Sequence, residues 1–87
     1  MLVHLGRGTT VAARDIIALA GLAPPLPEDT ERLLSRLRAC GAVRTLGEEP
    51  KTLVLCRRGG ARGAEEVCYL SCVGLRTLRE RAGYSYR

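Results

Sequence analysis

The shortness of the chain restricts its fold more than any other feature. Eighty-seven residues make one domain of ordinary size and leave no room for a second one. A chain of this length buries about 60–65% of the surface that it exposes when unfolded, so a lone subunit has little stability to spare. Disulfides, a metal or association between subunits are the usual remedies. We therefore expect a single domain over residues 1–87 that needs further support.

The chain is nearly free of aromatic residues and carries a net positive charge. Only 3% of its residues are aromatic, all of them tyrosine, so the core must be aliphatic and base stacking on rings is disfavoured. The formal charge is +5, and Lys51 is the one lysine among 14 basic residues. Such a balance favours polyanionic partners such as DNA, RNA or an anionic membrane. A GC-rich genome is an alternative source of the arginine bias, but it does not explain the excess of positive charge.

The four cysteines predict neither a disulfide framework nor a metal site. They contain no Cys-x-x-Cys pair, and the single histidine, His4, is distant in sequence. The first residues lack a basic leader and a sustained apolar run, and no segment has the length of a membrane span. We expect a cytoplasmic protein without cofactor, metal or membrane contact. In that compartment thiols stay reduced, and we expect buried cysteines that pack as small hydrophobic residues. These are Cys40, Cys56, Cys68 and Cys72.

The first third of the chain predicts extended structure, with one ambiguous segment. Residues 1–6 form a strand pattern, Arg7-Gly8 is a turn signal, and residues 9–11 are extended and β-branched. The apolar run that follows fits one face of a helix capped by Thr9 or Thr10. It fits a buried strand over 16–20 equally well, and periodicity does not decide between the two.

The clearest element is a helix over residues 29–40. A proline-rich linker, 23–27, precedes it and excludes helix there. Asp29 or Thr30 can cap the first turn, and Gly41 suits the position after the last turn. The leucines at 33, 34 and 37 form one apolar stripe with Cys40.

The second half predicts a hairpin between two shorter elements. Residues 42–46 form a short strand, and 52–56 is an apolar run whose two faces are both covered. Residues 57–64 read as a loop rich in glycine and arginine, 67–72 as the returning strand, and 75–81 as a short helix ended by Gly83. The order of elements is typical of an α+β fold with a small antiparallel or mixed sheet and two helices.

Nothing in the sequence supports catalysis, so we expect no enzyme. The chain has one histidine and no Gly-x-Ser-x-Gly motif, whereas a nucleophile needs a base and an orienting group. We expect His4 to take part in packing. The paired acids Glu48-Glu49 and Glu65-Glu66 stand at strand entries, where neighbouring side chains point to opposite faces. The glycine-containing turns at 6–8 and 59–63 match no Walker pattern.

Arginines at two places suggest contacts with phosphate. Arg14 lies within an apolar run, where a long charged side chain must reach water or a partner. An alternative is a surface pair of Arg14 with Asp15. A second cluster, Arg57, Arg58 and Arg62, stands among glycines. Arginine binds phosphate bidentately, and glycines let a loop follow a duplex. A solvated hairpin tip without function is the alternative there.

An ordered set of short strings resembles one protein family. The strings are VHLG at 3–6, VAARDII at 11–17, PKTLVL at 50–55, YLS at 69–71 and TLRER at 77–81. Together they resemble the extracellular matrix regulators of the RemA/RemB type, small proteins of Gram-positive bacteria, and the RemB branch most. The resemblance covers nearly the whole chain and rests on the order of the strings.

The resemblance implies a DNA-binding transcriptional regulator of biofilm-matrix genes. It implies a fold similar to LytTR DNA-binding domains, subunits assembled into a homo-oligomeric ring with duplex DNA along its outside, and a strand over 16–20. The family's arginine after the second strand corresponds to Arg14. Its arginine-rich turn corresponds to a segment in which Lys51 is basic but Glu48 and Glu49 oppose phosphate. A second hypothesis follows from those acids, namely an assembly module without DNA contact that acts with a paralogous regulator.

Overall fold

The computed structural model describes residues 1–60 and 63–83, and these residues form an α+β fold. In chain order the elements are β1 (Leu2–Gly6), β2 (Thr9–Ala12), the 3-10 turn η1 (Ala13–Asp15), β3 (Ile16–Gly21), α1 (Glu28–Ala39), β4 (Val43–Leu46), β5 (Thr52–Gly60), β6 (Gly63–Ser71) and α2 (Leu75–Ala82). The predicted α+β class is confirmed. The ambiguous apolar run resolves into η1 followed by strand β3.

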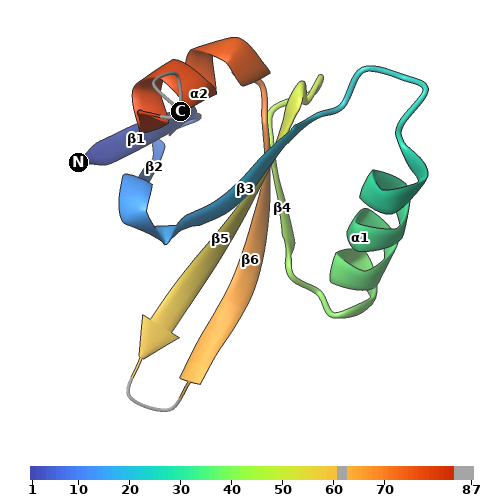
Figure 1. Cartoon of the computed structure of the whole chain (residues 1–87), viewed down its shortest axis with the longest axis horizontal. Coiled ribbons are helices and arrows are strands. Elements are labelled where there is room, and N and C mark those ends of the chain that lie inside the picture. The colour runs from blue at the N-terminus through green and yellow to red at the C-terminus, as the bar shows by residue number, and fades with distance from the viewer. Residues whose placement is uncertain (61–62, 84–87) are drawn as a thin grey trace.

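The strands form two sheets of unequal size. The larger has the order β3-β5-β6-β4, and β1 and β2 form a separate antiparallel hairpin. Strand β4 is parallel to β6, and β3 and β6 both run antiparallel to β5, so β3 and β4 have the same direction. Two strands of the same direction need a crossover, and α1 supplies it. Figure 1 shows α1 on one side of the larger sheet and the β1–β2 hairpin with α2 on the other.

Helix α1 begins differently from the way that the sequence suggested, but it ends as expected. Pro27 is the N-cap and no side chain caps the helix, so the predicted cap at Asp29 or Thr30 is wrong. The backbone N–H of Glu31 donates to the Pro27 carbonyl instead. Three acids occupy the first turn, where the helix dipole favours negative charge. Gly41 has φ of 70° and its N–H donates to the Arg38 carbonyl, so the expected C-terminal glycine is confirmed.

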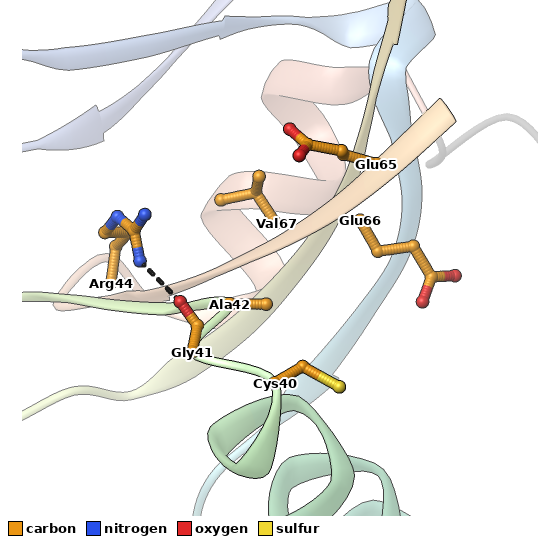
Figure 2. A pocket seen from close by; sticks show the side chains of 7 residues that line it. All are labelled: Cys40, Gly41, Ala42, Arg44, Glu65, Glu66 and Val67. Carbon is orange, nitrogen blue, oxygen red and sulfur yellow. Dashed lines mark hydrogen bonds between the residues drawn. The ribbon is translucent and has the colours of Figure 1, made fainter. Parts of the chain in front are cut away.

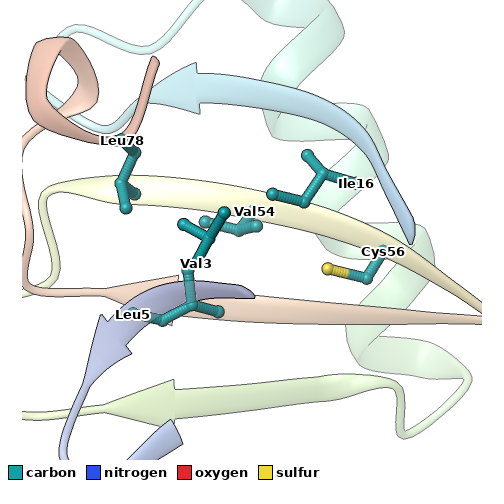
Figure 3. Close-up of a cluster of buried hydrophobic side chains, with 6 residues drawn as sticks. All are labelled: Val3, Leu5, Ile16, Val54, Cys56 and Leu78. Atoms are coloured by element: carbon teal, nitrogen blue, oxygen red, sulfur yellow. The ribbon is translucent and has the colours of Figure 1, made fainter. Parts of the chain in front are cut away.

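Two hydrophobic clusters lie on opposite faces of the larger sheet. The α2-side core, shown in Figure 3, consists of Val3, Leu5, Ile16, Val54, Cys56 and Leu78. The α1-side core consists of Leu37, Leu53, Leu55, Cys68 and Leu70. Side chains along a strand alternate between faces, so β5 supplies both cores in turn. The prediction that 52–56 is covered on both faces is therefore confirmed.

A buried serine connects the two sheets. The Ser71 hydroxyl donates to the Leu5 carbonyl at 2.6 Å and accepts from the Val73 N–H at 3.0 Å. Thr52 is also fully buried, and its hydroxyl donates to the Val73 carbonyl at 2.7 Å. Buried hydroxyls are costly unless they are hydrogen-bonded, and both are satisfied. They fix β1 and the start of the β6–α2 connection against the larger sheet.

Several expectations about single elements are wrong. Most of the segment predicted as loop, 57–64, is strand, because β5 runs to Gly60 and β6 starts at Gly63. The side chain of His4 is exposed, because β1 turns Val3 and Leu5 inward and His4 outward. Cys56 and Cys68 are buried, but Cys40 and Cys72 are exposed. Cys40 follows the last residue of α1 and leaves the apolar stripe there.

Candidate nucleic-acid interface

Arg14 lies at one end of the larger sheet, in the short turn η1 between β2 and β3. Its side chain is exposed, and it forms no ion pair with the residues that the structure describes. The alternative of a surface pair with Asp15 is therefore not seen. Ala13 is fixed by an N–H bond to the Met1 carbonyl at 2.9 Å, and Ile16 pairs with Cys56 on β5. The turn is thus held at both ends, and the guanidinium is left toward solvent.

Arg57 and Arg58 lie at the same end of the sheet, because β5 continues past the pairing of Ile16 with Cys56. Both arginines are exposed. They line a hollow of about 190 Å³ together with Asp15 of η1, residues of β2, and Tyr69 of β6. The structure therefore brings Arg57 and Arg58 close to the turn that carries Arg14. This grouping depends on a pairing between residues 40 positions apart, which no local pattern contains.

Glutamates stand directly opposite both hairpin arginines. In the ladder of β5 with β6, Arg57 pairs with Glu66 and Arg58 with Glu65. Opposite charges across an antiparallel pair stabilise it by about 0.2–1 kcal/mol each. These cross-strand neighbours favour strand although the glycines suggested a loop, while the ion pair of Glu66 itself is with Arg36 on α1 at 3.6 Å. The two glutamates also reduce the positive field that the two arginines can offer to phosphate.

A cysteine with a raised pKa is among the residues that line the hollow. Cys56 is 1% exposed, and burial raises its pKa to about 11, with a further contribution from the charge of Asp15. A thiol with such a pKa stays protonated near neutral pH and is unreactive. Cys56 therefore serves packing, as the sequence predicted.

Lys51 does not join the arginines. It precedes β5 at the end opposite Arg57, and six residues of strand separate their Cα atoms by about 20 Å. Its backbone is held by bonds to Leu22 and Ser71, and its side chain is exposed. Glu48 and Glu49 are exposed in the same loop. The predicted set thus divides into a cluster at the η1 end and one cation at the other end, while Arg62 lies outside the described residues.

The structure adds cations that sequence reasoning missed. Arg76, Arg79 and Arg81 are exposed on α2, which lies on the same side of the sheet as η1 (Figure 1). Arg81 donates to the His4 carbonyl at 2.9 Å, while Arg76 and Arg79 are three residues apart and share a helix face. The sequence pattern of α2 could have predicted them. If Leu75 and Leu78 face the core, then Arg76 and Arg79 are turned away from it.

Comparison with known proteins gives no match: neither a family model nor a curated protein is similar to the chain. Within the described residues no helix is long and apolar enough to cross a membrane, and no cluster of three metal-binding side chains occurs in that part of the chain.

Proposed function

We propose that the protein is a DNA-binding transcriptional regulator of the RemA/RemB type, which binds the backbone of duplex DNA. The exposed Arg14, Arg57 and Arg58 make the contact, and the observation that carries the proposal is that η1 and this part of β5 lie at the same end of the larger sheet. Arginine forks bind phosphate oxygens in pairs, and phosphate contacts supply affinity without sequence preference. The scarcity of aromatic rings agrees with this mode and disagrees with base stacking.

The proposal includes a LytTR-like fold and a cytoplasmic homo-oligomer, with a closed ring as its form. Two observations support assembly. The chain is small, so additional burial between subunits raises stability. The cation cluster of one subunit is also limited by the opposing glutamates, so strong binding needs several subunits on one duplex.

An anisotropy titration of labelled duplex DNA at two salt concentrations tests DNA binding. We expect binding that weakens steeply with salt. Arg14→Ala should lower both the affinity and the salt slope, the slope by about 0.9 for each phosphate that the variant no longer binds. Arg38→Ala is the matched control, because Arg38 is exposed on α1, on the other side of the sheet. No binding at low salt, or an equal fall in affinity for both variants, would overturn the proposal.

A second candidate is an assembly module that acts through a paralogous regulator without touching DNA. Glu65 and Glu66 opposite the hairpin arginines, and Glu48 and Glu49 beside Lys51, favour it because acids repel phosphate. Capture of a related regulator together with the absence of any DNA shift would support this candidate.

A further inference from the structure

Among the described residues, part of β6 has no neighbouring strand on one side. Strand β4 begins at Val43, which pairs with Cys68, so residues 63–67 lie beyond the end of β4. The Cys68 N–H donates to the Ala42 carbonyl at 2.8 Å, which shows that the polar backbone groups of Cys68 face β4. Backbone groups alternate in direction along a strand, so the N–H and C=O of Glu66 face the same side. No described strand pairs with them there.

The segment that precedes β4 cannot pair with this part of β6. The Ala42 N–H is committed to the Leu37 carbonyl at 2.9 Å, and Gly41 ends the helix. Unpaired N–H and C=O groups on a strand edge are a template for another strand. The edge of β6 at Glu66 therefore offers one donor and one acceptor to an added chain.

Two cavities lie along this edge. One, of about 270 Å³, is lined by Cys40, Gly41, Ala42, Arg44, Glu65, Glu66 and Val67. Figure 2 shows Glu65 and Val67 on one side of β6 and Glu66 on the other. The second cavity, of about 330 Å³, is lined by Arg36, Leu37, Cys40, Ala42, Arg57 and Glu66. The side chains of an added strand alternate between faces, so they would enter the two cavities in turn.

The charges of the larger cavity select an acidic side chain. Arg36 and Arg57 border it, and Glu66 is the one acid among its lining residues. Arg36 Nη1 lies 3.6 Å from Glu66 Oε1, and Arg57 stands opposite Glu66 in the ladder. One positive charge is therefore left over. On the other face the buried Val67 borders the smaller cavity and offers an apolar surface to the neighbouring residue of an added strand.

We propose that the edge of β6 binds an extended acidic segment of a partner protein, which joins the larger sheet as a strand in line with β4. Main-chain hydrogen bonds to Glu66 supply affinity, and the excess of arginine supplies the preference for acids. A second copy of this edge is a poor occupant, because antiparallel pairing would set the glutamates of both copies against one another. Arg57 borders this site and also belongs to the proposed DNA contact, whereas Arg14 and Arg58 line neither cavity.

Labelled synthetic peptides test this proposal. The probes are an unstructured peptide of about ten alternating valine and glutamate residues, a valine–lysine counterpart, and the acidic peptide with alternate backbone nitrogens methylated. Anisotropy titrations should show the acidic peptide binding about tenfold or more tightly than either of the others, a difference of about 1.4 kcal/mol. The leftover arginine attracts glutamate and repels lysine, and the methylated peptide has lost N–H groups that would pair with the strand edge. Equal affinity for the acidic and basic peptides would overturn the proposal.

Two variants locate the site. Glu66→Pro removes the outward N–H while the ladder with β5 keeps its bonds, so peptide binding should be lost. Glu49→Pro, in a distant loop, is the control and should bind normally. Arg36→Glu reverses the charge at an exposed helix position and should weaken acidic-peptide binding about tenfold. This variant tests the peptide site even if Glu66→Pro does not fold. Wild-type binding by Arg36→Glu, or a native mass of two copies that Glu66→Pro reduces to one, would overturn the choice of an acidic partner.

Discussion

Burial divides the four thiols into two classes. Cys56 belongs to the α2-side core and Cys68 to the α1-side core, so their side chains point away from each other and cannot form a disulfide. Burial raises the pKa of each to about 11, above the ordinary value near 9. Cys40 and Cys72 are exposed, so any thiol oxidation among the described residues would have to use these two side chains.

Thiol titration should separate the two classes. With a thiol reagent at about pH 8, where only exposed thiols have appreciable thiolate, we expect Cys40 and Cys72 to react rapidly. Cys56 and Cys68 should react only after a denaturant is added. The double variant Cys40→Ser, Cys72→Ser should lose the fast phase completely. A third thiol reacting fast in the native wild-type protein would contradict the burial of both core cysteines.

Ser71 should contribute more to the stability of the fold than its small side chain suggests. Ser71→Ala leaves the Leu5 carbonyl and the Val73 N–H without their partner, and an unsatisfied buried group costs about 1–3 kcal/mol. We expect the free energy of unfolding in urea to fall by that amount. Ser35→Ala, at an exposed position of α1, is the matched control and should stay within about 0.5 kcal/mol of wild type. Equal stability of the two variants would contradict the role of Ser71.

At the scale of elements, the sequence predicted the helices well, because leucine spacing and glycine positions are local patterns. The leucine spacing predicts α1, and Gly41 and Gly83, both at positive φ, mark the ends of the two helices. The far half of the hairpin was missed because glycines and arginines suggest a loop. Its strands form through pairs such as Arg57 with Glu66, and a cross-strand pair is invisible until the register is known.

The same pairs give a prediction about DNA binding. Glu65→Gln with Glu66→Gln removes the acids opposite the two hairpin arginines, so DNA affinity should rise and the salt slope should steepen. Glu48→Gln with Glu49→Gln removes the same charge beside Lys51 and should raise affinity less, because Arg14 and the hairpin lie at the other end of the sheet. Anisotropy titrations of both double variants at matched salt measure this difference. A larger gain in the Glu48/Glu49 variant would place the DNA contact at Lys51.

At the scale of the whole molecule, the sequence predicted which residues belong to the candidate site but not which of them lie close together. The charge pattern and the family resemblance named Arg14, Lys51 and the hairpin arginines as one group. The sheet order β3-β5-β6-β4 then sets Lys51 apart from the others. That order depends on pairings distant in sequence, which a local pattern does not encode.

Duplex length should control affinity if several subunits bind one DNA. Each cation cluster is small, so a duplex of about 10 base pairs, roughly one helical turn, should bind weakly. A duplex several turns long engages more subunits, and its affinity should rise by a factor of about 100 or more. Competition titrations with duplexes of increasing length, at constant nucleotide concentration, measure this rise. An affinity per nucleotide that does not change with length would contradict assembly on the DNA.

The hairpin of β5 and β6 extends past β3 and β4 (Figure 1), so its outer part contributes to neither core. Residues inserted there in pairs, one on each strand, preserve the alternation that assigns Val54 to one core and Leu55 to the other. A single residue inserted between Thr52 and Val54 would instead exchange those assignments. Insertions beyond the pair of Arg58 with Glu65 therefore leave both cores and both proposed contacts in place, and a fluorescent tag or an affinity epitope belongs there.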